Sequence, residues 1–276
     1  MIFAEPVTKL IPARRSVRNF APGLAPEKVQ LLRDYLADVD GLGDTLVRLR
    51  LVDSGEAAGD ARIGTYGIIR GAGHFIVAVV PHGNPAASAQ LGYRLEKAAL
   101  YAVSLGLGTC WLGGTFTHGA FARLVELRPG YDLPIVMPVG VPAGRPHLLE
   151  RLMRAVPGAD KRKEWYELFF DGDADHALSR QRAGAFAGPL DMARLAPSSM
   201  NSQPWRIVRA GNAFHFFGYS ANGPLAEVHR IDVGIAMCHF GLTAREAGLP
   251  GEFTLEKPEG LDSPSHFTFV ASWISA

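Results

Sequence analysis

The first residues that could do chemistry form a short basic run near the N-terminus, ARRSVRNF at residues 13–20. Arg14, Arg15 and Arg18 place three guanidinium groups close together, beside the hydroxyl of Ser16. Planar guanidinium groups and a hydroxyl suit a phosphate monoester, which accepts several charge-assisted hydrogen bonds at once. A solvated basic turn would carry the same residues, so the run by itself leaves both interpretations open.

A second polar run, APSSMNSQPW at residues 196–205, lies between a predicted helix and a predicted strand. Its residues offer hydroxyl and amide groups at close range: Ser198, Ser199, Asn201, Ser202 and Gln203. Such residues often cap their own turn through side-chain to backbone hydrogen bonds. The alternative is a site that hydrogen-bonds a polar heterocycle and a polyol, with Trp205 as packing.

A third run, GLGTCWLGG at residues 106–114, is rich in glycine, which lets the backbone approach a ligand closely. The run does not follow a strand. It has neither the spacing of a dinucleotide fingerprint nor the Lys-Ser/Thr ending of a P-loop. It is either a tight helix-to-strand turn or a loop whose backbone N–H donates to a flat ligand.

Several other kinds of site are disfavoured. The nine histidines include no i, i+4 pair beside an acid, which argues against zinc. Cys110 has no adjacent base, so a buried thiol is favoured over a nucleophile, and two cysteines cannot make a disulfide framework. The acidic run at 171–175 lacks the final glutamate of a calcium loop.

Charge also limits the partners. The 28 Lys and Arg nearly balance the 27 Asp and Glu, so the chain has no global attraction for nucleic acid or an anionic membrane. Any anion site must therefore be local.

A chain of 276 residues, 47% hydrophobic and 20% charged, has ample material for a core that positions these runs. Residue spacing predicts helices at 26–38, 90–105, 189–195 and 231–247, the two long ones ending at Gly106 and Gly248. Apolar or alternating runs predict strands at 45–52, 75–80, 134–141, 205–209, 214–217 and 267–273, with 134–141 broken by Pro138. This order predicts an α+β fold with a mixed sheet.

The two long helices end alike. The offset that aligns Gly106 with Gly248 also aligns Gly92 with Gly234. We interpret this as an internal duplication, with chance likeness between two apolar helices as the alternative. The first half would span residues 1–160 and the second half residues 161–276.

The apolar stretch at 98–117 carries no charge and is about as long as a membrane span. Four glycines interrupt it, and Glu96 and Lys97 precede it, so we expect a buried helix followed by a loop. Glu5 and Pro6 interrupt any apolar run at the N-terminus. We therefore expect no signal peptide and a cytoplasmic protein.

Together, the three runs and the basic cluster at 161–163 resemble the nitroreductase-like family of FMN-dependent oxidoreductases, over most of residues 10–210. The resemblance implies a nitroreductase-like mixed sheet flanked by helices. It implies FMN as cofactor, NAD(P)H as electron donor, and hydride transfer through flavin N5 to a nitroaromatic, a quinone or a similar acceptor. Members of the family are obligate dimers with the flavin at the subunit interface.

The resemblance also assigns residues, and it requires no side-chain acid or base. Arg14, Arg15 and Ser16 would hold the phosphate and the pyrimidine edge of the ring, and Lys161 and Lys163 would add phosphate contacts. Leu112 and Gly113 would lie against the N5 edge. The other half would line the ring and ribityl chain with Pro197, Ser198, Ser199 and Asn201.

One feature departs from ordinary members, in which the Ser-Ser-x-Asn run follows the Arg-Arg-Ser run by a few tens of residues. Here it lies in the second half, and the matching part of the first half, residues 38–45, reads DVDGLGDT. The chain therefore resembles a single-chain branch of the family, a fused and diverged dimer.

This layout implies one flavin site per chain and no strict need for a homodimer, although a further homodimer stays open. Two other functions also stay open. One is a non-enzymatic flavin-binding sensor or carrier. The other is an FMN-dependent dehydrogenase or dehalogenase with a dedicated substrate.

Overall fold

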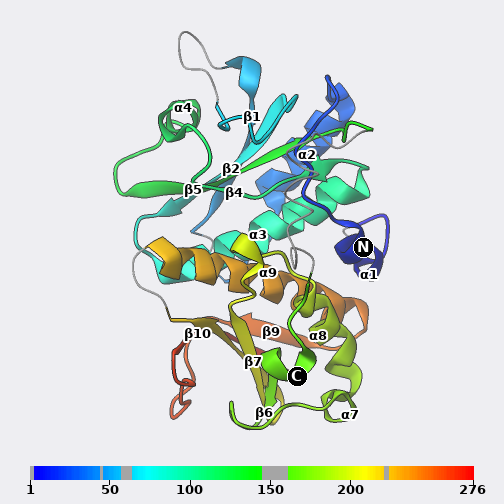
Figure 1. Ribbon diagram of the computed structural model, residues 1–276, viewed down its shortest axis with the longest axis vertical. Helices are drawn as coiled ribbons and strands as arrows, with labels where there is room; N and C mark the ends of the chain where they lie inside the picture. Colours follow the sequence, from blue (N-terminus) through cyan, green and yellow to red (C-terminus); the bar gives the residue numbers. More distant parts are fainter. Residues whose placement is uncertain (1–2, 44–45, 57–63, 145–160, 221–223) are drawn as a thin grey trace.

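The computed structural model describes residues 3–43, 46–56, 64–144, 161–220 and 224–276. Within these ranges, two five-stranded sheets lie at opposite ends of the molecule, and the two longest helices cross between them (Figure 1). The first sheet is built from residues before 145 and the second from residues after 160. Residues 145–160, which precede the predicted boundary between the halves, lie outside the described residues, so the boundary between 160 and 161 stays a prediction.

The helices of the described residues are α1 (Val7–Ala13), α2 (Pro26–Asp38), α3 (Pro85–Ser104), α4 (His118–Leu124), α6 (Trp165–Leu168), α7 (Arg180–Ala183), α8 (Ala187–Arg194) and α9 (Pro224–Glu246). The bounds of α2 agree with the prediction. Helix α3 begins earlier than expected because the Asn84 side chain accepts a hydrogen bond from Ala87 N (3.1 Å) and Pro85 fits the first helical turn. As predicted, Gly106 and Gly248 follow the two long helices, both at positive φ.

The first sheet contains β1 (Arg48–Asp53), β2 (His74–Pro81), β3 (Gly108–Thr109), β4 (Leu112–Gly113) and β5 (Tyr131–Gly140). Its described strands pair antiparallel in the order β1-β2-β5-β3, with β4 also on β5. The predicted break at Pro138 is wrong, because β5 runs through this residue. Pro138 lies opposite the gap between β3 and β4, where a residue without an N–H interrupts no ladder on that side.

The second sheet contains β6 (Phe169–Asp171), β7 (Trp205–Ala210), β8 (Ala213–Tyr219), β9 (Gly251–Thr254) and β10 (Phe267–Ser275). Its order is β6-β7-β8-β10-β9, and the parallel β6–β7 pair makes it a mixed sheet. The strand predicted at 267–273 is present as β10, and a register shift between Phe269 and Ala271 accompanies four consecutive buried residues, 270–273.

Helices α3 and α9 pack through a pair of glycines. A Cβ atom on Gly92 would overlap the carbonyl oxygen of Ile231, and one on Gly234 would overlap the carbonyl oxygen of Ala89. The offset that aligns Gly92 with Gly234 also aligns Ala89 with Ile231. The two contacts are therefore equivalent under exchange of the helices, which is the arrangement expected of a fused dimer.

Each long helix also covers the sheet of its own half. Leu91, Leu95 and Ala98 of α3 belong to one buried cluster with Ile76 and Met137 of the first sheet. Trp205, Phe216 and Trp273 of the second sheet belong to one buried cluster with Phe240 of α9. Among the helices that the structure describes, none is long and apolar enough to cross a membrane.

Candidate active site

A buried polar cluster joins the two halves, and we name it the Glu96 cluster: Arg14, Glu96, Trp111 and His239. Glu96 lies on α3 with none of its surface exposed. Its Oε1 atom lies 3.4 Å from Arg14 Nε and 3.0 Å from His239 Nε2, and its Oε2 atom accepts a hydrogen bond from Trp111 Nε1 at 3.0 Å. One carboxylate therefore contacts the basic run, the glycine-rich run and α9.

His239 extends this cluster toward the second polar run. Its Nδ1 atom lies 3.0 Å from the carbonyl oxygen of Met192 on α8, the helix that leads into that run. A carbonyl oxygen only accepts, so Nδ1 carries a proton and donates it. One further proton lies between His239 Nε2 and Glu96 Oε1, so this contact is a charge-assisted or shared hydrogen bond inside the core.

The neighbouring residues of the basic run lie in different surroundings. Arg14 is 9% exposed, and its Nη1 atom is buried with no hydrogen-bond partner among the described residues. Arg15 is exposed and donates to the carbonyl oxygens of Pro12 and Arg14. Ser16 pairs with Thr109, which ties the run to β3. Of the two arginines, Arg14 is the one with an unused, desolvated donor.

The second polar run forms a tight turn that holds the basic cluster at 161–163. Asn201 accepts from Arg162 Nη1 (2.7 Å) and donates through Nδ2 to the carbonyl oxygen of Lys161 (2.8 Å). Gln203 accepts from the backbone N–H of Lys163 (2.7 Å). Both amide side chains therefore position this cluster.

The turn is strained. Met200, Asn201 and Gln203 all have φ near +50°, in the left-handed region that non-glycine residues rarely adopt. Its hydrogen bonds offset this cost: Ser198 Oγ accepts from Gln203 N (2.9 Å), and Gln203 donates to the carbonyl oxygen of Asn201 (3.0 Å). Met200 is 98% exposed at the tip. Strain held by the surroundings is typical of ligand sites.

Asp232 of α9 holds this turn through hydrogen bonds to its backbone. Its carboxyl oxygens accept from the backbone N–H of Ser199 at 3.1 and 3.2 Å. Burial raises the pKa of Asp232 to about 8, although the bond from Ser199 opposes the rise. On α3, the offset of the duplication places Gln90 at the equivalent position, where it accepts from Leu46 N (3.2 Å) and donates to Leu42 O (2.9 Å).

Leu112 and Gly113 lie side by side on β4. The Leu112 side chain is buried in the core beneath the first sheet, with Phe75 and Phe121. Gly113 is exposed, and a side chain there would press against Ile135. Of the two, Gly113 is the residue that leaves its backbone open to a ligand.

The structure thus brings 161–163 together with Asn201, and connects Arg14 to the α8–turn element through Glu96 and His239. Pro197 is half-buried at the start of the turn, and Ser199 is exposed. The sequence reasoning missed Glu96, Asp232 and His239. A signal was present, since each is an ionisable side chain within an otherwise apolar helix face.

Comparisons with known proteins give the family of the chain and a solved structure of similar fold. The family described as "Putative TM nitroreductase" matches residues 6–244. No curated protein matches the chain. A putative nitroreductase from Thermotoga maritima MSB8 has a similar fold, with a TM-score of 0.63, 20% identity, and coverage of 98% of this chain and 94% of that chain.

Two other solved structures match about half of the chain. An FMN-dependent nitroreductase from Clostridium difficile R20291 has a TM-score of 0.41 and 16% identity, covering 53% of this chain and 95% of that chain. An NADPH:FMN oxidoreductase from Vibrio harveyi, complexed with NAD+, has a TM-score of 0.40 and 20% identity, covering 51% of this chain and 73% of that chain.

Proposed function

Because the chain belongs to the family described as "Putative TM nitroreductase", which supports a general oxidoreductase role, we propose that it is an FMN-dependent NAD(P)H oxidoreductase. The acceptor would be a nitroaromatic, a quinone or a similar small molecule. The single observation that best supports FMN as the cofactor is the buried Nη1 donor of Arg14. This donor lacks a hydrogen-bond partner among the described residues. A desolvated guanidinium donor is costly unless an acceptor meets it, and a flavin offers several.

The residues around Arg14 fit such a ligand. Glu96 fixes the guanidinium from one side and leaves Nη1 unused. Gly113 keeps its backbone exposed on β4. When bound, FMN would supply the two-electron chemistry, taking a hydride at N5 and passing it to the acceptor.

The remaining roles belong to this chain's own groups. Arg14 would place positive charge beside the flavin ring or its phosphate, which favours an anionic reduced flavin. Arg15 and Ser16 would add contacts from the same segment. Lys161 and Lys163 would contribute charge to the phosphate, held in place by the turn of Pro197, Ser198, Ser199 and Asn201.

Flavin binding tests this proposal. Apo-protein is titrated with FMN while the flavin fluorescence is followed, and oxidation of NADH and of NADPH is then measured with a quinone as acceptor. We expect Arg14→Ala to weaken FMN binding by one to two decades, because one charge-assisted contact contributes about 1.5–3 kcal/mol. Arg15→Ala should have a smaller effect, since Arg15 already bonds its own helix end.

Arg33→Ala is the matched control, because it removes the same charge from an exposed position on α2. Unfolding of the apo forms separates loss of the ligand from loss of the fold. Unchanged FMN affinity in Arg14→Ala would show that Arg14 does not contact the flavin. Tight FMN binding without oxidation of NADH or NADPH would favour a flavin sensor or carrier instead.

We also propose that residues 1–160 and 161–276 are the two halves of a fused dimer with one flavin site. The Arg-Arg-Ser run occurs in the first half only and the Pro-Ser-Ser run in the second half only. The two runs therefore complete one site and leave the opposite position without either. Flavin released by denaturation and counted against protein should give one FMN per chain, and two would refute the arrangement.

A further inference from the structure

A cavity of about 150 Å³ lies at one end of the second sheet, beside the basic cluster at 161–163. It is lined by Lys163, Ser202, Pro204, Arg206, Tyr219, His229 and Phe267. Lys163 precedes α6, and Ser202 and Pro204 belong to the turn before β7, while the other four residues come from the start of β7, the end of β8, the start of β10 and α9. With the exception of Lys163, none belongs to the predicted flavin contacts.

The cavity is positively charged. Lys163 and Arg206 both line it, and neither forms an ion pair with any residue that the structure describes. Burial, and then the charge of Arg206, lower the pKa of Lys163. The two cations are therefore close enough to repel each other. Glu167 acts on both from outside the cavity, where it is exposed and occupied in capping α6. One carboxylate cannot neutralise two cations.

The cavity also contains unused hydrogen-bonding capacity. Ser202 Oγ is buried without a partner among the described residues. Lys163 Nζ has one long contact, 3.4 Å to the carbonyl oxygen of Gln203. Arg206 is held in place, since it donates to Trp205 O (2.7 Å) and its guanidinium lies 5.0 Å from the centre of the Phe267 ring.

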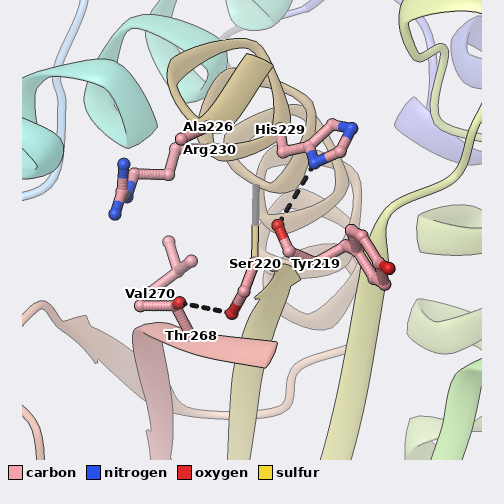
Figure 2. Close-up of a pocket in the computed structure, with 8 residues that line it drawn as sticks. Tyr219, Ser220, Ala226, His229, Arg230, Thr268 and Val270 are labelled. Carbon is pink, nitrogen blue, oxygen red and sulfur yellow. Dashed lines mark hydrogen bonds between the residues drawn. The ribbon is translucent and has the colours of Figure 1, made fainter. Parts of the chain in front are cut away.

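His229 closes the cavity from α9. Its Nδ1 atom donates to the carbonyl oxygen of Tyr219 at 3.2 Å, which fixes the ring (Figure 2). The side chains drawn in Figure 2 line a neighbouring, smaller cavity, which has a volume of about 20 Å³ and shares Tyr219 and His229 with the larger one. Arg230 lies on the far side of that smaller cavity from His229.

We propose that the cavity between Lys163, Arg206 and His229 binds a phosphate monoester group. Such a group has three acceptor oxygens and a double negative charge, which match a guanidinium, an ammonium and a hydroxyl donor. The cavity, at about 150 Å³, is several times larger than one water molecule, which takes up roughly 30 Å³ in the liquid. The aromatic rings of Tyr219 and Phe267 add apolar surface to the lining, which suits the organic part of such a ligand.

Two ligands of the proposed function could supply this group, and this part of the inference rests on that function. One source is the 5′-phosphate of FMN. The other is the 2′-phosphate that distinguishes NADPH from NADH. Both present the same chemistry to the cavity, so experiment must separate them.

The first experiment uses inorganic phosphate as the probe and needs no flavin. Thermal unfolding of the apo-protein is measured over a phosphate series, against sodium chloride at matched ionic strength. Wild type should be stabilised by phosphate, as expected for a ligand that binds only the folded state. Arg206→Gln should weaken phosphate binding at least tenfold.

Arg209→Gln is the matched control, because it makes the same change on the same strand but Arg209 does not line the cavity. It should respond to phosphate like wild type. Arg206→Lys, which keeps the charge, should retain part of the effect and exclude simple misfolding. Phosphate stabilisation that is absent from wild type, or equal in Arg206→Gln, would overturn the proposal.

The second experiment separates the sources. Tenfold weaker FMN binding in Arg206→Gln, with an unchanged ratio of NADPH to NADH efficiency, would assign the flavin phosphate. A fall in that ratio with unchanged FMN binding would assign NADPH. Failure of every form to bind FMN would refute the proposed function, while the phosphate series would still decide whether the cavity is an anion site.

Discussion

The two long helices resemble each other in packing but differ in the polar groups they carry. Gly92 and Gly234 make equivalent contacts across the crossing, whereas Glu96 of α3 aligns with Cys238 of α9, and Gln90 aligns with Asp232. The two helices therefore share their packing contacts, whereas each carries different polar side chains. A fused dimer can tolerate this, because each half is free to keep only the groups that its own side of one site needs.

The largest effect should come from Glu96, whose aligned residue in the second half is the thiol Cys238. We expect Glu96→Gln to destabilise the apo-protein by about 3–5 kcal/mol, since it leaves the buried Arg14 charge without its carboxylate. Denaturant unfolding measures this. Cys238→Ala, at the aligned position of α9, is the comparison and should cost less; equal losses would mean that Glu96 serves packing alone.

Asp232 should give the chain a pH dependence that Gln90 does not. Its folded pKa, about 8, lies above the unfolded value of about 3.9, so the folded state binds more protons between these values and stability falls as pH rises. Wild type should lose about 3 kcal/mol relative to Asp232→Asn between pH 5 and pH 7.5, at about 1.4 kcal/mol per pH unit.

The matching change in the first half is Gln90→Glu. The new carboxyl would face the carbonyl oxygen of Leu42, now an acceptor for Gln90 Nε2, and would keep a proton near neutral pH. Its stability should also fall as pH rises. Parallel pH curves for wild type and Asp232→Asn would contradict the raised pKa.

The glycine pair should respond alike in both halves. Gly92→Ala and Gly234→Ala each place a methyl group against a backbone carbonyl, and each should cost about 1–3 kcal/mol through forced separation of α3 and α9. Gly188→Ala in α8 is the control, since nothing lies within 4 Å of the new methyl group. Unequal losses of stability in Gly92→Ala and Gly234→Ala would show that the two glycine contacts are not equivalent.

Asn201 should show the smallest effect on folding. Asn201→Ala removes its bonds to Arg162 and Lys161 and should lower stability by about 1 kcal/mol. It should nevertheless weaken FMN binding, because the basic cluster at 161–163 loses a support. Calorimetry of the apo form and FMN titration separate the two; lost stability with unchanged FMN affinity would give Asn201 a capping role alone.

Local signals in the sequence predicted the elements well. Helix α2 could be delimited because Pro26 starts it and Leu32 and Leu36 repeat at helical spacing. Strand β5 could not, because its passage through Pro138 depends on a gap between β3 and β4 that lie elsewhere in the chain. Tertiary pairing decided that case.

The same limit applies to the site. The sequence alone assigns the same role to Arg14 and Arg15, because they are adjacent arginines in one run. Only the fold separates them, by placing Glu96 beside Arg14 and leaving Arg15 exposed. The strained turn at 200–203 was equally hidden, because left-handed backbone at a methionine follows from the contacts around it and not from its own preference.

The crossing of α3 and α9 has a consequence for how this chain behaves on dilution. In an assembly of two separate chains, the contact between Glu96 and His239 would be lost when the protein concentration falls below the dissociation constant. Here both residues belong to one chain, so they meet in a unimolecular step whose equilibrium does not depend on the protein concentration. Joining of the halves is then set by their intrinsic affinity and not by how much protein the cell makes.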